Sequence, residues 1–417
     1  MKTLSIILLF ILTSLLQGQE VTSYNLDIKI DVNKKSINVE GSVDVDFKSK
    51  DSINLVLWKN TDIKEISCDG KNLKYLFDTL SPTPVMYIIN GSSLTIKKPM
   101  QNDVKQSIKF IYECNMKEFK SWSASFEENW IEINVYCGWF PVSFDSRSYT
   151  SNFKIYIDEN YVVTGSGIVE KKNNYWEMIQ PWPAFDNVII ASKKLKSKVL
   201  NENNAFIQTY YNDNDFSDSD ADSILSECKY VLNLFERFFG KKDSTYLKFV
   251  IAPFEWGGGY SRKNFVSMRT KHFNLYTSTK GIAHEIAHFW WNGAVTTTWE
   301  DWLNEAFAEY SMLLYIRERI GLEEFQKQVE EYKSKIKNLP PIWGIERDSQ
   351  EAYSVLYEKG SLILFELENK ISKDQFLDFL KEVSKSKIVT TDGLLNLMEK
   401  KLSKETQIWL ENKLKVY

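Results

Sequence analysis

The segment His284-Glu285-Ile286-Ala287-His288 is the most informative part of this 417-residue chain, because its spacing indicates both a helix and a metal site. Residues four apart in a helix project from one face, so both imidazoles can reach a single ion about 2.0 to 2.1 Å away. Glu285 then lies beside the open coordination position. The chain has only three histidines, so this pairing is a specific signal, and a pair of surface histidines is the weaker interpretation.

A catalytic zinc ion usually takes three protein ligands and keeps a fourth position for water. Glu305 is the further donor that we expect, at the start of a second helix predicted from about Trp299 to Ile320. Its apolar neighbours make a paired or metal-bound carboxylate more natural than a solvated one. Glu309 fits the alternative of an ordinary exposed helix glutamate better. The sequence thus predicts one zinc ion held by His284, His288 and Glu305.

This site would suit the hydrolysis of a peptide bond. A bound zinc ion lowers the pKa of its water to about 7 and polarises a carbonyl group. Glu285, close to the metal but not bound to it, is the natural general base. The oxyanion then needs a further donor, for which a tyrosine hydroxyl is suitable.

Several motifs resemble those of one family, the gluzincin metallopeptidases of the aminopeptidase N type. The histidine segment matches its H-E-x-x-H, residues 302–305 match its W-L-N-E, and residues 291–296 are similar to its F-G-N-L-V-T. Residues 357–360 match its Y-E-K-G, so the resemblance implies that Tyr357 is the oxyanion donor. It also implies an α+β architecture: an antiparallel, β-rich saddle domain followed by a thermolysin-like, mainly α-helical catalytic domain with a small sheet.

The chain departs from this family where the substrate's free amine should bind. The family's G-x-M-E-N strand, whose glutamate grips that amine, appears here as Gly257-Gly258-Gly259-Tyr260-Ser261. The glycines still suit an edge strand that pairs with an extended peptide, although a tight turn is an equal alternative. Glu132 is a weak candidate for another amine-contacting acid, because as an outward residue of an alternating strand it needs no function.

Two further departures concern length. Sixteen residues separate His288 from Glu305, a shorter connection than is usual in the family. The chain also stops about sixty residues beyond Tyr357. We therefore expect it to lack the helical domain that closes the cleft of longer relatives, and to have a more open site.

Period-two alternation of apolar residues from Tyr24 to about residue 192 predicts a β-rich domain over residues 19–195. The polar stretch 193–204 suits a boundary, and the catalytic domain is assigned to residues 196–417. Within it we expect a helix from Asp220 to Phe239, capped by Gly240. Thr277 and Ser278 are possible N-caps of the histidine helix, which should run to about Trp291.

The first residues predict export. Lys2 precedes an apolar run from Leu4 to Leu16, which is typical of a signal peptide over residues 1–18. We therefore expect a secreted or periplasmic protein, with no later segment of the roughly 18 to 20 apolar residues that cross a membrane. Of four cysteines, Cys228 lies on the apolar face of a predicted helix as a buried thiol, which leaves at most one disulfide among the others.

The formal net charge of -4 gives no broad basic field, so we expect no nucleic-acid partner. The leading hypothesis is a zinc metallopeptidase acting on peptides or proteins, aminopeptidase-like but with an altered amino-terminus site, and monomeric. One alternative is a peptidase that does not require a free amino terminus. The other is a zinc-containing peptide-binding protein without turnover, which would need neither Glu285 nor Tyr357.

Overall fold

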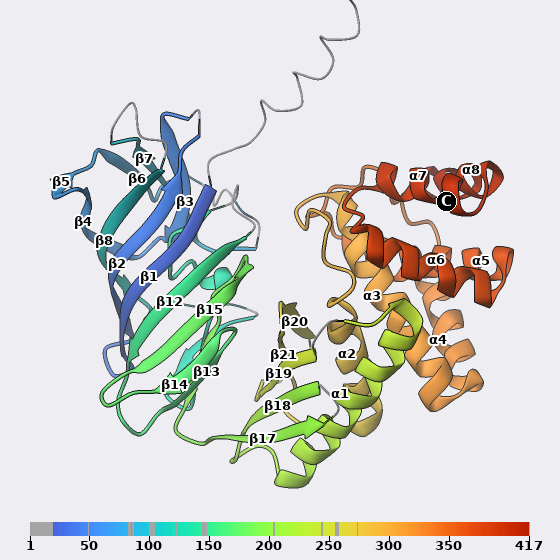
Figure 1. Ribbon diagram of the computed structural model, residues 1–417, viewed down its shortest axis with the longest axis horizontal. Helices are drawn as coiled ribbons and strands as arrows, with labels where there is room; N and C mark the ends of the chain where they lie inside the picture. Colours follow the sequence, from blue (N-terminus) through green and yellow to red (C-terminus); the bar gives the residue numbers. More distant parts are fainter. Residues whose placement is uncertain are drawn as a thin grey trace, which may run out of the picture. The chain divides into compact units, whose positions relative to one another are not determined.

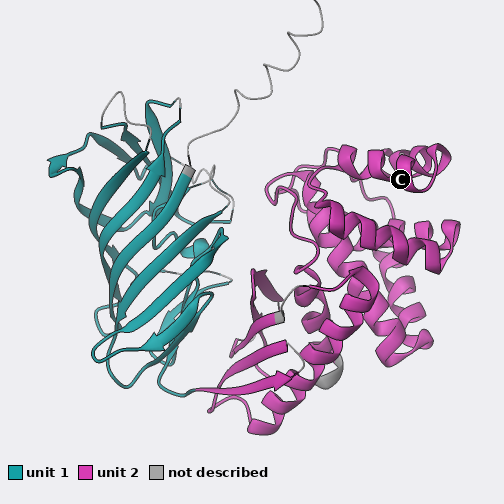
Figure 2. Ribbon diagram, viewed as in Figure 1, with its two compact units in different colours: residues 1–195 teal, residues 196–417 magenta. Residues whose placement is uncertain are grey.

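The computed structural model describes residues 20–48, 50–81, 85, 87–99, 105–119, 121, 123–143, 148–202, 205–242, 245–254, 258–272 and 274–416. The expected signal peptide lies outside these residues. The chain divides into two compact units, residues 1–195 and 196–417 (Figure 2). No helix in the described part of the chain combines the length and apolarity needed to cross a membrane.

Unit 1 consists of β-strands, as the alternating sequence predicts (Figure 1). Its largest sheet has eight strands in the order β14-β15-β12-β1-β2-β8-β4-β5. The strands are β14 (Ile168–Lys171), β15 (Trp176–Ala184), β12 (Tyr149–Tyr156), β1 (Glu20–Asp31), β2 (Ser36–Asp46), β8 (Lys105–Asn115), β4 (Thr61–Cys68) and β5 (Lys71–Asn72). Most neighbours are antiparallel, whereas β1 and β12 run parallel.

Two four-stranded sheets complete unit 1, in the orders β13-β16-β10-β9 and β11-β3-β7-β6. The first contains β13 (Val162–Gly165), β16 (Ile189–Ser192), β10 (Trp130–Ile133) and β9 (Ser125–Glu127). The second contains β11 (Val142–Ser143), β3 (Ser52–Trp58), β7 (Gly91–Lys97) and β6 (Tyr75–Asp78). A short 3-10 helix, Val135–Cys137, follows β10. The alternating side chains of these strands form one apolar core that belongs to unit 1 alone.

Unit 2 places a five-stranded sheet beside a group of helices. The sheet order is β17-β18-β19-β21-β20, formed by β17 (Leu195–Glu202), β18 (Ala205–Asn212), β19 (Thr245–Ala252), β21 (Phe265–Arg269) and β20 (Gly258–Arg262). The polar stretch 193–204, whose composition suits a domain boundary, includes strand β17. An edge strand tolerates such lysine-rich composition because one side of its backbone remains unpaired in the sheet.

The helices of unit 2 are α1 (Asp218–Phe239), α2 (Leu275–Ala287), α3 (Trp302–Tyr315), α4 (Leu322–Lys335), α5 (Gly360–Ile371), α6 (Lys373–Ser386), α7 (Thr391–Lys401) and α8 (Lys404–Lys415). The 3-10 helix Trp299–Asp301 precedes α3, and π-helical segments Ile316–Ile320 and Ser354–Lys359 precede α4 and α5. One face of the sheet and the inner faces of the helices share a second core. The predicted α+β architecture is confirmed.

Helix α1 confirms the expected helix before Gly240. A capping box between Ser217 and Asp220 begins the helix, so the acidic entrance satisfies backbone donors. Gly240 follows its last residue with a φ of 98°, which favours glycine. Cys228 is completely buried on this helix, the other three cysteines are buried as well, and within the described residues none of the four forms a disulfide.

Candidate metal centre

Helix α2 carries the histidine pair. Its residues Ile282, Ala283, Ile286 and Ala287 are fully buried in the core of unit 2, which turns His284 and His288 toward α3. The expected N-caps are wrong, because the side chain of Asn274 accepts a hydrogen bond from the Thr277 backbone N–H at 3.1 Å. The regular helix also ends at Ala287 rather than Trp291, so His288 lies in the tighter turn that directly follows it.

Helix α3 supplies Glu305 in its first turn, as predicted. The preceding connection is fixed by Asn304, whose side chain bonds both the N–H and the carbonyl oxygen of Ala294 at 3.1 Å. Asn304 also donates to Asp301 at 2.8 Å. The shortened connection between the two helices is therefore hydrogen-bonded to Asn304, the residue next to Glu305.

The structure brings the three predicted ligands together. Glu305 Oε2 lies 3.4 Å from Nε2 of His284 and 3.4 Å from Nε2 of His288. Donors about 2.0 to 2.1 Å from a tetrahedral zinc ion are separated by about 3.3 Å, so the residues fit the ion. Glu305 Oε2 is also buried and accepts no hydrogen bond from any described residue. Burying a carboxylate oxygen without a hydrogen bond costs free energy unless a cation binds it.

The other ring nitrogen of each histidine is bound to the protein. His288 Nδ1 donates to the Trp291 carbonyl oxygen at 3.0 Å, and His284 Nδ1 lies 2.7 Å from Glu309 Oε2. Glu309 accepts a second hydrogen bond from the Tyr332 hydroxyl. These partners favour the tautomers that leave both Nε2 atoms available to a metal. The expectation that Glu309 is an exposed helix glutamate is wrong, because it is 6% exposed.

Charges around the site shift the pKa values of its residues. Burial alone would lower the pKa of His284, but Glu305 and Glu309 outweigh it and raise that pKa well above its usual value. Burial would raise the pKa of Glu305, but His288 and His284 lower it far below its usual value. Burial raises the pKa of Glu285, despite the opposing charges of both histidines. The ionised carboxylate and the two imidazoles thus lie together where a divalent cation would bind.

Glu285 lies against strand β20, the edge strand of the sheet. A Cβ atom on Gly259 would lie 2.8 Å from Glu285 Oε1, so only glycine lets the backbone pass this close. The predicted edge strand is therefore confirmed for Gly258 and Gly259, while Gly257 lies outside the described residues. Tyr260 is 4% exposed, and the Arg262 guanidinium carbon lies 4.5 Å from the centre of its ring.

Tyr357 lies in the π-helical segment before α5. Its ring stacks on the imidazole of His284, with centroids 5.9 Å apart and an interplanar angle of 6°. Burial and the neighbouring Glu305 raise the pKa of Tyr357 well above its usual value, so the hydroxyl stays protonated and able to donate. The structure therefore brings Tyr357 to the ligand group from a segment far along the chain.

The glycine of the Y-E-K-G segment explains how Tyr357 reaches this position. A Cβ atom on Gly360 would lie 2.5 Å from the Cβ atom of Ala306, the residue after Glu305. The absence of a side chain at Gly360 lets α5 touch α3 here, next to the candidate ligand. Helix contacts this close require small residues on both sides.

Arg347 is a residue near the site that sequence reasoning missed. Its Nε donates to Asp301 Oδ2 at 2.8 Å, and its guanidinium carbon lies 6.0 Å from the Tyr357 ring centre. Asp301 is 1% exposed, and burial together with Glu305 raises its pKa to about 7, against the opposing charge of Arg347. An unusually buried aspartate four residues before Glu305 has no signal of its own in the sequence.

Glu132 belongs to strand β10 of unit 1 rather than to the unit that holds the histidines. Expecting it to face outward was wrong, because every residue of β10 is buried and Glu132 is fully so. Its carboxylate accepts a hydrogen bond from the Trp130 indole at 3.1 Å. The contact of Glu132 with a substrate amine stays a prediction. His272, the third histidine of the chain, is exposed.

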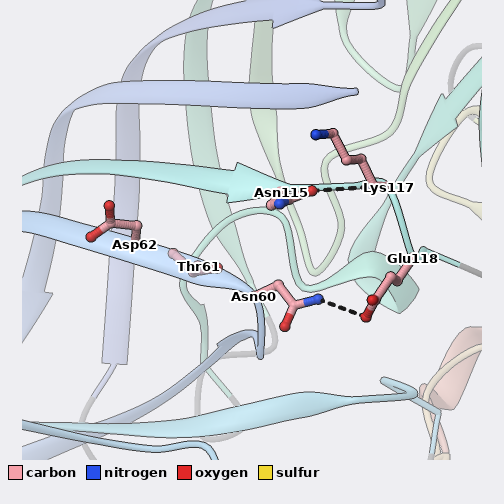
Figure 3. Close-up of a pocket in the computed structure, with 6 residues that line it drawn as sticks. All are labelled: Asn60, Thr61, Asp62, Asn115, Lys117 and Glu118. Atoms are coloured by element: carbon pink, nitrogen blue, oxygen red, sulfur yellow. Dashed lines mark hydrogen bonds between the residues drawn. The ribbon is translucent and has the colours of Figure 1, made fainter. Parts of the chain in front are cut away.

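A polar depression of about 470 Å³ lies on unit 1 (Figure 3). It is lined by Asn60, Thr61, Asp62, Asn115, Lys117 and Glu118. Asn60 donates a hydrogen bond to Glu118 at 3.5 Å, and the Lys117 backbone N–H donates one to the Asn115 side chain at 3.1 Å. Among the described residues, only the ligand group of unit 2 has three donors close enough to share an ion, all within 4.8 Å of one another. The described residues that could share a metal ion thus belong to unit 2.

Residues 264–412 match the family model described as the peptidase family M1 domain. The chain carries a peptidase family M1 domain. The resemblance to gluzincin peptidases of the aminopeptidase N type is thereby confirmed. This M1 domain contains His284, His288, Glu305 and Tyr357, whereas strand β20 precedes the matched region.

Relatives and solved structures agree with the M1 domain. Leucine aminopeptidase 2 of Candida albicans is 24% identical over 373 residues, which cover 84% of this chain and 57% of that protein. The chain thus spans less than two thirds of the length of this curated relative. The M1 zinc metallopeptidase of Deinococcus radiodurans has a TM-score of 0.74 at 16% identity, covering 96% of this chain and 94% of that one.

Leukotriene A4 hydrolase of Saccharomyces cerevisiae has a TM-score of 0.73 at 18% identity. The match covers 96% of this chain and 68% of that chain. At these identities the structural likeness shows the fold, which both units share with these proteins.

Proposed function

We propose that this protein is a zinc-dependent metallopeptidase that hydrolyses peptide bonds in peptide or protein substrates. The observation that carries the proposal is the ligand geometry, with Glu305 Oε2 3.4 Å from both Nε2 atoms and without a hydrogen bond from any described residue. The M1 domain match supports the same conclusion. His284, His288 and Glu305 would hold one zinc ion.

The residues around this ion divide the reaction between them. When bound, zinc would lower the pKa of a water to about 7 and polarise the scissile carbonyl. Glu285 would take the proton of the attacking water and deliver it to the leaving amine. Tyr357, protonated and stacked on His284, would donate a hydrogen bond to the developing oxyanion. Glu309 would keep His284 in the tautomer that binds metal.

The proposed mode is aminopeptidase-like, with an altered site for the substrate's amino terminus. A contact of Tyr260 with the substrate at this altered site is supported by its position on β20, next to Gly259, which lies against Glu285. Strand β20 carries no acidic side chain from Gly258 to Arg262 that could pair with an ammonium group. A peptidase that ignores the free amine is therefore the second candidate. Substrate contact by Gly257, Gly258, Gly259 and Glu132 belongs to the same proposal.

Cleavage of one peptide and of its N-acetylated twin decides between these modes. An aminopeptidase should lose most of its kcat/KM on the acetylated twin, because the charged amine no longer contributes to binding. Undiminished cleavage of the blocked peptide would remove the aminopeptidase assignment and leave the peptidase assignment intact.

The remaining alternative is a zinc protein that binds peptides without turnover. The placement of Glu285 and Tyr357 around the ligands argues against it, because binding needs neither a base nor an oxyanion donor. Zinc analysis of the purified protein, together with incubation with a mixed peptide pool, tests the alternative. Stoichiometric zinc with an unchanged pool would establish binding alone.

We also propose that the protein is exported and acts as a monomer outside the cytoplasm. The support is the apolar run Leu4 to Leu16 after Lys2. Amino-terminal sequencing of the mature protein should begin near residue 19. Recovery of an intact Met1 terminus from the cytoplasm would contradict export, and light scattering would test the monomer.

A further inference from the structure

Arg347 is held firmly although it lies in an irregular segment. Its Nε donates to the buried Asp301 at 2.8 Å, and Asp301 is itself held by Asn304 at 2.8 Å. The segment is anchored nearby, because the Trp343 backbone N–H donates to the Leu414 carbonyl oxygen at 2.9 Å. The Trp343 ring also packs on Trp299 with centroids 4.9 Å apart. An arginine fixed in this way needs little ordering before it binds a ligand.

Most of the donors on this guanidinium remain available. Arginine carries five N–H donors in a planar fork, and Asp301 engages Nε alone. Neither Nη atom of Arg347 is hydrogen-bonded to a residue in the described part of the chain. The side chain is 20% exposed, so these donors are partly sheltered yet can be reached from solvent. In contrast, Arg317 uses both Nη1 and Nη2 on Glu368.

The guanidinium group of Arg347 lies close to Tyr357, one of the residues proposed to act in the reaction. Its guanidinium carbon is 6.0 Å from the centre of the Tyr357 ring, and that ring stacks on the candidate ligand His284. An extended peptide advances about 3.3 Å per residue, so this distance corresponds to about two residues of substrate. A group bound by Arg347 would therefore lie close to the scissile bond.

We propose that Arg347 binds a carboxylate of the substrate within about two residues of the scissile bond. The proposal rests on the peptidase function proposed above and assigns it a substrate class: short peptides with a free carboxyl terminus, or peptides with an acidic side chain at this point. A carboxylate matches the planar fork in shape and charge, which a neutral amide does not. Asp301 orients the arginine without covering its Nη edge.

The first test uses the protein without any substitution. A short peptide is compared with its carboxyl-terminal amide, and an amidated peptide with glutamate beside the cleaved bond is compared with its glutamine counterpart. A charge-assisted pair should raise kcat/KM of one acid over its neutral twin by roughly tenfold, mainly through KM. The pair that shows the difference identifies the source of the carboxylate.

The second test assigns the preference to this residue. In Arg347→Met the ratio of kcat/KM between acid and neutral twin should fall to about one, and Arg347→Lys should retain part of it because the charge remains. Arg319→Met is the matched control, since Arg319 pairs with the buried Glu227 at 3.2 Å and has no part in the site. The ratio should be unchanged in that variant.

Each outcome has one meaning. Equal cleavage of acids and neutral twins by the unsubstituted protein overturns the proposal and leaves the peptidase function standing. A preference that survives Arg347→Met overturns it as well, because Arg347 would then only hold Asp301 in place. If no peptide of either kind is cleaved although zinc is bound, the proposed function itself fails.

Discussion

At the scale of single residues, the candidate site depends on which nitrogen of each histidine is left free. Glu309 occupies Nδ1 of His284, and the Trp291 carbonyl occupies Nδ1 of His288. Both Nε2 atoms then face Glu305 at 3.4 Å. The metal-binding geometry is thus set by partners that are not themselves ligands.

Replacing Glu285 separates metal binding from catalysis. In Glu285→Gln the side chain keeps its size but loses the ability to take a proton, so we expect turnover to fall by several orders of magnitude. Zinc content, measured by elemental analysis, should stay unchanged. Turnover equal to that of the unsubstituted protein would exclude Glu285 as the base.

Replacing Tyr357 removes a single hydroxyl. Tyr357→Phe keeps the ring that stacks on His284 but takes away the donor to the oxyanion. Because that donor acts in the transition state, kcat should fall more than KM rises. Steady-state kinetics on one peptide measures both, and a change confined to KM would argue for a role in binding only.

Replacing Glu309 tests the partner of His284. In Glu309→Gln the negative charge beside Nδ1 is lost, and zinc affinity should weaken by roughly 10 to 100 times. Competition with a zinc chelator measures this affinity. The control is Glu324→Gln, which removes an acid that pairs with Lys280 at 3.0 Å rather than with a histidine. Equal zinc affinity in all three proteins would show that Glu309 does not support the ligand.

At the scale of elements, the site forms where three segments meet. Helix α2 carries the histidines, α3 carries Glu305, and the π-helical segment Ser354–Lys359 carries Tyr357. Gly360 sets the distance between the last two, because it touches Ala306. Gly259 plays a similar part between β20 and Glu285.

A larger residue at Gly360 should force α5 away from α3. Gly360→Val would drive side-chain carbons into Ala306, and such overpacking costs about 1 to 3 kcal/mol of the free energy of unfolding. The fall in kcat should be larger than the loss of folded protein explains, because Tyr357 moves with the helix. Denaturant unfolding and kinetics measure the two effects.

The matched control is another helical glycine, Gly281. A Cβ atom there meets only the Met268 sulfur at 3.3 Å, so Gly281→Ala should be neutral or stabilise by up to about 1 kcal/mol through helix propensity. If Gly360→Val were equally harmless, the close contact between α3 and α5 would not determine the position of Tyr357.

At the scale of the whole molecule, each unit has its own apolar core, and only that of unit 2 surrounds the candidate metal centre. Zinc should therefore stabilise unit 2 by binding its folded form. Protons compete with zinc for the same nitrogens. The stability of the protein should then depend on pH in opposite ways with and without the metal.

The zinc-free protein should lose stability as pH rises. The pKa values of His284 and His288 are raised by neighbouring carboxylates, although burial opposes the shift. The stabilisation that the protonated histidines contribute is complete below about pH 6.5, the pKa of histidine in the unfolded chain. It is lost as pH rises through their higher pKa values in the folded protein. The contribution of Glu305, whose pKa is lowered, is lost only in acid.

Zinc binds the neutral imidazoles, so the increase in Tm on adding zinc should grow from about pH 6 to about pH 9. Thermal unfolding with and without zinc over this range measures it. A zinc-induced shift independent of pH would contradict the assignment of both histidines as ligands.

Much of the site was predictable because its signals are local. The spacing of His284 and His288, the apolar residues between them and the position of Glu305 in the following helix require only helical periodicity. Tyr357 was predictable only through the resemblance of its four-residue segment to a family. Glu309 was misjudged, because its partners His284 and Tyr332 come from other helices and leave no mark in the residues around it.

The sequence by itself determined which residues have the chemistry to bind a metal, and that strands precede helices, because side-chain periodicity and donor type are written in short segments. Only the tertiary structure decided that Glu305 Oε2 lies 3.4 Å from both imidazoles, that Glu132 is buried, and that Arg347 lies beside Tyr357. These facts depend on contacts between residues far apart in the chain, which form when burying apolar surface packs the elements together.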